Sequence, residues 1–135
     1  MSQELPPRGS ALLIVDDEIN VLRSLARLLH PDGHHVLTAS TIDQALELLA
    51  RHDVRVVISD ERMVGSTGTG FLARVATLHP GATRILLSGN IRTPEIAHAV
   101  ACGTVHRLLE KPWDDDEVRA AVAEALQADP GLRGG

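Results

Sequence analysis

Residues 11–17 read Ala-Leu-Leu-Ile-Val-Asp-Asp, an unbroken apolar run that ends in two carboxylates. Such a continuous run is typical of a strand buried on both faces of a parallel sheet, because a strand with one face in solvent would alternate apolar and polar residues. Residues 54–60, Val-Arg-Val-Val-Ile-Ser-Asp, again place an aspartate after an apolar run. The two stretches predict central parallel strands with acidic residues at their carboxyl ends.

Three further apolar runs, at residues 34–39, 84–88 and 105–109, alternate with stretches whose apolar residues recur at helical spacing. Strict strand–helix alternation implies parallel strands joined by right-handed crossovers. The run at 34–39 is the most polar, so we expect it at a sheet edge. The sequence therefore predicts a doubly wound α/β fold, with a five-stranded parallel sheet of order 2-1-3-4-5 and helices on both faces.

Local signals mark several element ends. Thr41 with Gln44 predicts a capping box, Thr93-Pro94-Glu95 predicts a helix start, and Gly103 predicts a helix stop. Residues 65–70 are rich in Gly, Ser and Thr but lack the Gly-Lys-Ser/Thr ending of a nucleotide-binding loop, so we interpret them as a flexible loop.

Composition narrows the class of protein. The chain has 135 residues, a net charge of −5, one cysteine, one Phe, one Trp and no Tyr. The absence of a Lys/Arg cluster and the scarcity of aromatics argue against direct binding to nucleic acid. No apolar run approaches the roughly 20 residues that span a bilayer. We expect a cytoplasmic protein with one domain at residues 11–128, a disordered tail at 1–10, and a tail or linker start at 129–135.

Polar and charged residues follow four of the predicted strands. Asp16 and Asp17 follow the first, Asp60 the third, Ser88 the fourth and Lys111 the fifth. In the predicted order these residues converge at one edge of the sheet. Two like charges about 4 Å apart repel by roughly 4 kcal/mol at an effective dielectric of about 20, so the carboxylates need counterions. Mg²⁺ suits such oxygen ligands and bridges readily to phosphate, and Lys111 supplies a second positive charge.

Four segments at these strand ends match a known pattern. They resemble the signatures of the receiver domains of two-component response regulators, which have the flavodoxin/CheY-like fold, over about residues 11–128. The segments are Val15-Asp16-Asp17-Glu18, Ser59-Asp60-Glu61-Arg62-Met63, Leu87-Ser88-Gly89 and Glu110-Lys111-Pro112-Trp113. Each motif is weak alone, but four in order at predicted strand ends are specific. Within the family the chain is most similar to receivers of hydrogenase-type NtrC regulators and HD-GYP phosphodiesterases.

The resemblance implies a metal site and a covalent site that share one residue. Asp60 would be the phosphoacceptor. Asp17 and Asp60 would bind Mg²⁺ directly, with the backbone carbonyl of Arg62 as a third ligand and Asp16 acting through water. Alone, Asp16 and Asp17 are equally well explained as a polar strand end and a helix cap, so the metal site depends on their convergence with Asp60.

The resemblance also implies roles for the remaining strand ends. Ser88 would hydrogen-bond a phosphoryl oxygen, although alone it is better explained as a turn residue. Lys111 would pair with the phosphate, and the Lys111–Pro112 peptide is a candidate cis bond. The family's switch residue, a Tyr or Phe on the fifth strand that is coupled to Ser88, is assigned to His106. A histidine there predicts an output that depends on pH near neutrality.

The sequence departs from the family pattern beside the predicted phosphoacceptor. The proline that usually follows Arg-Met is Val64, and the usual Gly-Met-Asp-Gly is replaced by residues 65–68, Gly-Ser-Thr-Gly. These changes predict a looser loop next to Asp60.

Three functions are compatible with these residues. The first is a signalling receiver that takes a phosphoryl group from a histidine kinase and acts on a tethered or separate output protein, with no turnover of an external substrate and with homodimerisation as an option. The second is a hydrolase or phosphotransferase that uses an aspartyl-phosphate, although a 135-residue chain leaves no room for a substrate cap. The third is a degenerate receiver that binds a partner without phosphorylation.

Overall fold

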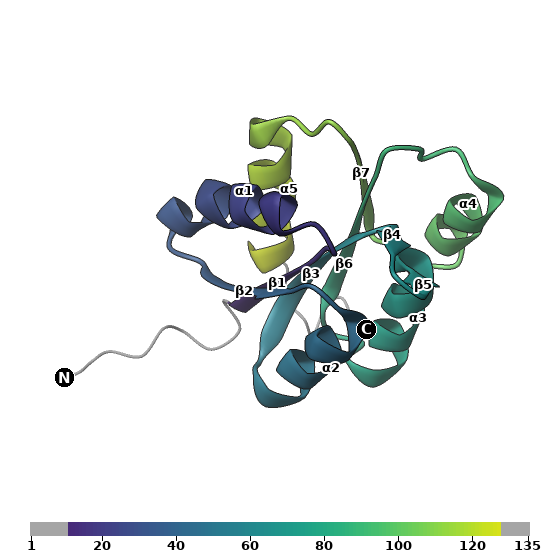
Figure 1. The fold of residues 1–135 in the computed structure, drawn as a ribbon, viewed down its shortest axis with the longest axis horizontal. Helices are drawn as coiled ribbons and strands as arrows, with labels where there is room; N and C mark the ends of the chain where they lie inside the picture. Colours follow the sequence, from purple (N-terminus) through teal and green to yellow (C-terminus); the bar gives the residue numbers. More distant parts are fainter. Residues whose placement is uncertain (1–10, 128–135) are drawn as a thin grey trace.

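The computed structural model describes residues 11–127. Within them, five parallel strands form one sheet of order β2-β1-β3-β6-β7, which confirms the predicted order 2-1-3-4-5 (Figure 1). The label numbers differ because a short hairpin, β4–β5, precedes the fourth strand of the sheet. The tails predicted at residues 1–10 and 129–135 lie outside the described residues, as does residue 128. No helix within residues 11–127 has the length and apolar character needed to cross a membrane.

The elements follow the predicted alternation closely. The sheet strands are β1 (Ala11–Val15), β2 (His35–Ala39), β3 (Val54–Asp60), β6 (Thr83–Ser88) and β7 (Arg107–Glu110). The helices are α1 (Ile19–Leu29), the 3-10 turn η1 (His30–Asp32), α2 (Ile42–Arg51), α3 (Gly68–Leu78), α4 (Pro94–Ala101) and α5 (Asp115–Gln127). Among the strands of the sheet, the largest boundary error concerns the fifth, which we predicted at 105–109 and which begins two residues later.

Each face of the sheet has its own apolar core, because successive side chains of a strand point to opposite faces. Leu12 and Ile14 of β1 pack with buried residues of α1 and α5. Leu13 and Val15 pack with buried residues of α2, α3 and α4. Figure 1 shows the corresponding layers, with α1 and α5 on one side of the sheet and α2, α3 and α4 on the other. The unbroken apolar run is thus explained by burial on both faces.

The predicted helix ends are present. The hydroxyl of Thr41 accepts a hydrogen bond from the backbone N–H of Gln44 at 3.1 Å, and the side-chain oxygen of Gln44 accepts one from Ser40 N–H at 2.8 Å. At the start of α4, the Thr93 hydroxyl accepts a hydrogen bond from Ile96 N–H at 3.2 Å. Gly103 follows α4 with a φ of 84°, a conformation that glycine adopts without strain.

The prediction of a flexible loop at residues 65–70 is wrong. Arg62–Met63 (β4) pairs antiparallel with Ser66–Thr67 (β5) across a turn at Val64 and Gly65. Gly65 has a φ of 77°, which a glycine at the second central position of a tight turn tolerates. The segment then enters α3, where the Thr67 hydroxyl accepts a hydrogen bond from Gly70 N–H at 3.0 Å. Two-residue strands are too short to show the apolar alternation by which strands are recognised, so the sequence pattern does not predict the hairpin.

Gly68 lies where α3 meets the end of β3. A β-carbon at this position would overlap the carbonyl oxygen of Asp60 and would lie 2.9 Å from both the Asp60 carbonyl carbon and the Glu61 α-carbon. These are backbone atoms at the end of a central strand, so they cannot rotate away as the tip of a side chain could. The start of α3 therefore packs against the end of β3 at a distance that only glycine permits.

We expect Gly68→Ala to lower the free energy of unfolding. The backbone overlap should cost about 1–3 kcal/mol, which exceeds the roughly 0.5–1 kcal/mol that alanine gains over glycine within a helix. Urea unfolding measures the difference. Gly81→Ala is the matched control, because a β-carbon there meets nothing within 4 Å. Equal stability of the two variants would contradict the close approach.

Candidate functional site

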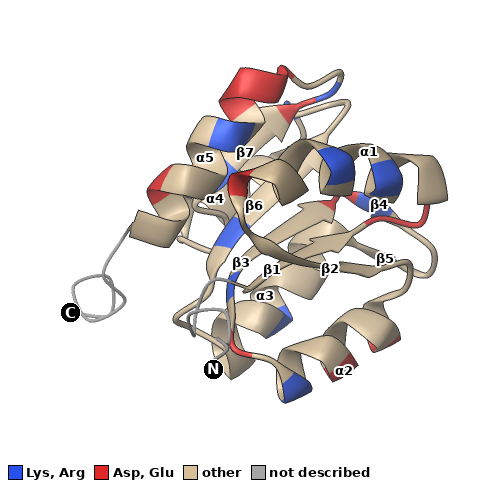
Figure 2. Ribbon diagram, turned by 90° about the vertical axis from the view of Figure 1, so that its left-hand side faces the viewer, with Lys and Arg blue, Asp and Glu red and all other residues tan. Residues whose placement is uncertain are grey.

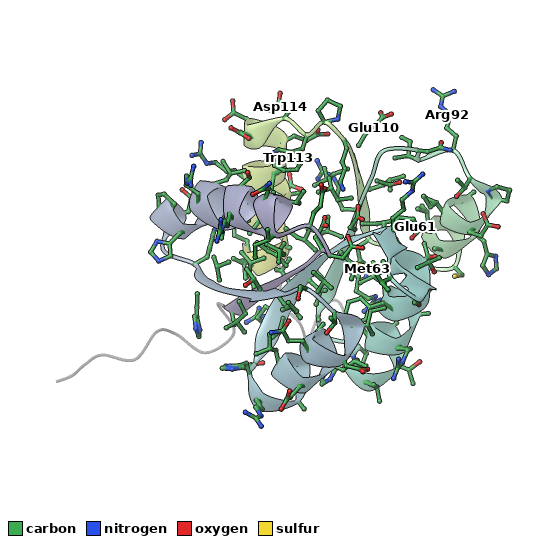
Figure 3. The ribbon with its side chains drawn as sticks, in the orientation of Figure 1. Glu61, Met63, Arg92, Glu110, Trp113 and Asp114 are labelled. Atoms are coloured by element: carbon green, nitrogen blue, oxygen red, sulfur yellow. The ribbon has the colours of Figure 1, made fainter. Side chains whose placement is uncertain are left out.

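The carboxyl ends of the central strands open into one cleft. Asp17, Asp60, Ser88 and Lys111 line a hollow of about 800 Å³, together with residues of the loops that follow β1, β3 and β6. Figure 3 shows Glu61 near the start of α3, while Arg92 projects outward from the loop before α4. The structure thus brings together the residues that we predicted at the ends of the first, third, fourth and fifth strands.

Lys111 joins two of the carboxylates. Its ammonium nitrogen lies 2.6 Å from Oδ1 of Asp60 and 3.6 Å from Oδ2 of Asp16. Burial alone would lower the pKa of Lys111, but the hydrogen bond to Asp60 and the charges of Asp60 and Asp16 outweigh burial and raise the pKa above the ordinary lysine value. The lysine is therefore held in its charged form at neutral pH.

Asp60 is held at both carboxylate oxygens. Besides the contact of Oδ1 with Lys111, its Oδ2 accepts a hydrogen bond from Arg62 N–H at 3.1 Å. The residue is only 7% exposed, yet it lines the cleft. A carboxylate held in this way presents its free lone pairs in a defined direction.

Asp16 carries a buried oxygen without a hydrogen bond. The residue is 2% exposed. Its Oδ1 accepts a hydrogen bond from Glu18 N–H at 2.9 Å, whereas Oδ2 accepts none from the described part of the chain. Burial raises the pKa of Asp16, against the lowering effect of the Glu18 hydrogen bond, and the nearby Asp60 carboxylate raises the pKa further. A buried carboxylate oxygen without a donor is costly unless a cation is close.

The three aspartates form a cluster that fits a hard divalent cation. Asp16, Asp17 and Asp60 each offer a carboxylate oxygen, and these oxygens lie within 4.8 Å of one another. Asp17 is exposed while the other two are buried, so the cluster opens toward solvent. Oxygen ligands that leave room for water suit Mg²⁺. Oδ2 of Asp16 has only the Lys111 ammonium at 3.6 Å and no hydrogen bond within the described residues, so a further cation in the cluster would stabilise it. Arg62 lines the same cleft, as its predicted role as a carbonyl ligand requires.

Ser88 closes a turn in the loop that leads to α4. Its hydroxyl donates a hydrogen bond to the Asn90 carbonyl and accepts one from Asn90 N–H, both at 3.1 Å. The residue is 5% exposed and lines the cleft. The structural role that we considered for Ser88 is therefore present, at a position from which the hydroxyl also faces the site.

The assignment of His106 as the residue coupled to Ser88 is wrong. His106 precedes β7, and its ring Nδ1 accepts a hydrogen bond from Arg84 N–H at 2.9 Å. Arg84 lies four residues before Ser88 on β6, a separation of about 13 Å along a strand. Around the guanidinium of Arg84, the carbonyls of Pro80, Ala82, Gly103 and Thr104 accept hydrogen bonds. His106 therefore lies at the far end of the sheet, and the predicted pH-dependent output has no basis in this position.

The side chain on β7 that shares a sheet face with Ser88 is Leu108. Ser88 pairs with Glu110 and Leu86 pairs with Leu108, so Leu108 lies two residues before the partner of Ser88. Leu86 and Leu108 both pack into the core on the side of α2, α3 and α4. Strand alternation from Glu110, the residue before Lys111, leads to Leu108, which carries neither an aromatic ring nor a polar group.

Two features follow the end of β7, a predicted cis peptide and the start of α5. The Lys111–Pro112 peptide is cis, as we expected. The acidic run that follows begins α5, where Oδ1 of Asp114 accepts hydrogen bonds from Asp116 N–H at 2.8 Å and Glu117 N–H at 3.2 Å. In Figure 2 the ribbon of this first turn of α5 is red, the colour of Asp and Glu. Carboxylates at a helix N-terminus stabilise the helix, so this run has a structural role.

Comparison with known proteins identifies the family. Residues 12–123 match the family model described as the response regulator receiver domain. The chain is 36% identical over 127 residues to the hydrogenase transcriptional regulatory protein HoxA of Cupriavidus necator, covering 94% of this chain and 26% of that protein. It is 34% identical over 116 residues to the transcriptional regulatory protein GlrR of Escherichia coli K12, covering 86% of this chain and 26% of that protein.

A solved structure gives the same result. The signal receiver domain of an HD domain-containing protein from Pseudomonas fluorescens Pf-5 superimposes with a TM-score of 0.83 at 35% identity, covering 94% of this chain and 92% of that one. The chain spans about a quarter of the length of the two regulators named above. The predicted resemblance, including the similarity to hydrogenase regulators and to HD-type proteins, is confirmed. The chain belongs to the family of response regulator receiver domains.

Proposed function

We propose that this receiver domain accepts a phosphoryl group from a histidine kinase onto Asp60, with Mg²⁺ bound beside it, and changes conformation as a result. The observation that carries the proposal is the contact of Lys111 with Asp60 at 2.6 Å inside a cluster of three aspartates. An ammonium group and a cation site on either side of one held carboxylate form an arrangement suited to a phosphoryl group, which brings negative charge into the cleft.

The chemistry assigned to Asp60 is nucleophilic. A carboxylate oxygen attacks phosphorus in line with the bond to the donor nitrogen, an O–P bond forms, the P–N bond breaks, and the electron pair returns to the imidazole of the donor. Lys111 and the Arg62 N–H orient the two oxygens of Asp60 before attack. After transfer, Lys111 pairs with the new phosphoryl oxygens. The domain catalyses its own phosphorylation and dephosphorylation and turns over no other substrate.

The metal would be held by the acidic cluster. Asp17, Asp60 and the carbonyl of Arg62 would bind it directly, and Asp16 would act through water. Bound there, Mg²⁺ supplies positive charge that offsets the oxygens of the phosphoryl group. The buried oxygen of Asp16 that has no hydrogen bond within the described residues and the exposed position of Asp17 support this assignment.

Conformational change would begin at Ser88. A phosphoryl oxygen within reach of its hydroxyl competes with Asn90, whose backbone the hydroxyl now binds. Exchange of that hydrogen bond would free the loop before α4 and bias a two-state equilibrium toward the active form. Leu108 would fill or leave the space beside Ser88 by packing alone, because it has no group that could hydrogen-bond a partner.

The relatives support a proposal for the output and the partners. HoxA and GlrR are transcriptional regulatory proteins of which this chain matches about a quarter. We propose a histidine kinase as phosphodonor and an output domain, tethered or separate, as the responding partner. Any contact with nucleic acid would be made by that output rather than by this acidic domain. A cytoplasmic location and pairing of two copies remain predictions.

A degenerate receiver that works without phosphorylation is the alternative. The departures at Val64 and at residues 65–68 favour it, since the usual loop sequence beside the phosphoacceptor is absent. The ordered hairpin that replaces that loop weighs against it. A hydrolase that uses an aspartyl-phosphate is another candidate function. Turnover of an unrelated phosphoester such as p-nitrophenyl phosphate by the purified protein would support it.

Asp60→Asn should abolish phosphoryl uptake, because an amide oxygen is a poor nucleophile at phosphorus. We expect the wild-type protein, incubated with Mg²⁺ and acetyl phosphate, to gain the mass of one labile phosphoryl group in intact-protein mass spectrometry. Asp53→Asn is the matched control, since Asp53 is an exposed aspartate at the opposite end of the same strand. A wild-type protein that gains no mass would favour the degenerate receiver.

Lys111→Met should slow phosphoryl uptake by roughly a hundredfold, the usual effect of removing one preorganised donor at a developing charge. The rate is measured from the same mass gain at saturating Mg²⁺. Arg92→Met removes an exposed cation from the loop before α4 and should leave the rate unchanged. Equal rates of phosphoryl uptake in Lys111→Met and wild type would contradict the role assigned to the ammonium group.

A further inference from the structure

The first turn of α3 is built on Glu61. An α-helix leaves its first backbone N–H groups without partners inside the helix. Here the carbonyl of Glu61 accepts a hydrogen bond from Gly68 N–H at 2.8 Å, and Oε1 of Glu61 accepts one from Thr69 N–H at 2.8 Å. The next N–H, that of Gly70, is bound by the Thr67 hydroxyl. One residue, seven positions upstream of the helix, thus satisfies the first two of these three donors.

Glu61 is tied to β6 as well. Its N–H donates to the carbonyl of Leu87 at 3.1 Å, and its Oε2 accepts a hydrogen bond from the Thr69 hydroxyl at 3.3 Å. Figure 3 places Glu61 beside the start of α3, as these contacts require. A carboxylate is also favoured electrostatically at a helix N-terminus. Four hydrogen bonds therefore hold this residue between a central strand and a helix.

The residues on either side of Glu61 belong to the site. Asp60 precedes it, and Arg62 follows it and donates its N–H to Oδ2 of Asp60. Gly68, which packs against the Asp60 carbonyl, donates its N–H to Glu61 as well. Any displacement of Glu61 consequently shifts the Asp60 carboxylate and the Arg62 backbone together. Phosphoryl transfer is sensitive to such shifts, because a misplacement of about 1 Å costs on the order of a hundredfold in rate.

We propose that Glu61 is a positioning residue for phosphoryl transfer to Asp60, and that it acts through the hydrogen bonds of its carboxylate to Thr69. The inference rests on the proposed function of Asp60. The proposal also explains how the segment beside Asp60 is held in place although the usual family sequence is absent. The hydrogen bonds of the Glu61 side chain and the Thr67 helix cap hold it.

The test compares Glu61→Ala with Glu61→Gln. Glutamine keeps an oxygen that accepts from Thr69 N–H and an amide that donates to the Thr69 hydroxyl, whereas alanine keeps neither. We expect Glu61→Ala to take up phosphate from acetyl phosphate about tenfold more slowly than wild type at saturating Mg²⁺, and to bind Mg²⁺ several-fold more weakly in a titration followed by Trp113 fluorescence. Glu61→Gln should restore both to within about twofold of wild type.

Controls separate positioning from folding and from charge. Glu95→Ala removes an exposed carboxylate from the first turn of α4 and should change neither quantity. Circular dichroism and urea unfolding identify the folded fraction of each variant. A folded Glu61→Ala variant with the wild-type rate of phosphate uptake and the wild-type Mg²⁺ affinity overturns the proposal. The hydrogen bonds from Glu61 to Thr69 would then contribute to stability alone. Equal defects in the Gln and Ala variants also overturn it, since negative charge would be the cause.

The two proposals fail in different ways. A wild-type protein that takes up no phosphate contradicts the phosphoacceptor role of Asp60. The Mg²⁺ titration of the Ala and Gln variants then decides by itself whether Glu61 positions the acidic cluster. Uptake by wild type with no difference among the Glu61 variants contradicts only the positioning role.

Discussion

The ammonium group of Lys111 makes the rest of this site possible. Asp16, Asp17 and Asp60 come from the ends of two adjacent strands, and their oxygens lie within 4.8 Å of one another. Such crowding is unfavourable in a poorly hydrated pocket without positive charge. The lysine, delivered by a third strand, offsets part of that repulsion through contacts with two of the aspartates. The sheet order matters for the site because it brings strands from distant parts of the chain to one edge.

The packing of the sheet explains why the charges gather at that edge. Both faces of the central strands are covered by helices, so the side chains in the middle of these strands are apolar, and polar groups lie toward the strand ends. The end of β3 is then fixed from several directions: Gly68 packs against the Asp60 carbonyl, and Glu61 bonds to both β6 and α3. The same contacts begin a helix and fix the end of the strand that carries Asp60.

Much of this was predictable from residues whose physical signal is local. Apolar runs predicted the strands, apolar residues at helical spacing predicted the helices, and charged residues at strand ends predicted the cleft. The errors arose where a signal depends on register or on distant contacts. The family resemblance, applied to a predicted strand at 105–109, placed the switch residue at His106, whereas the pairing of Ser88 with Glu110 points to Leu108. The β4–β5 hairpin and the tie from Glu61 to Thr69 depend on contacts across the fold, which no window of sequence contains.

The cluster of carbonyls around Arg84 has a mechanical consequence. Through Gly103 and Thr104, this arginine anchors the chain just beyond the carboxyl end of α4, at the edge of the sheet away from the cleft. The amino end of α4 follows Thr93, which lines the cleft. A helix fixed at one end and pushed at the other rotates rather than slides. If the loop before α4 were displaced, the carboxyl end held by Arg84 would act as the pivot, and the amino end of the helix near the cleft would move further.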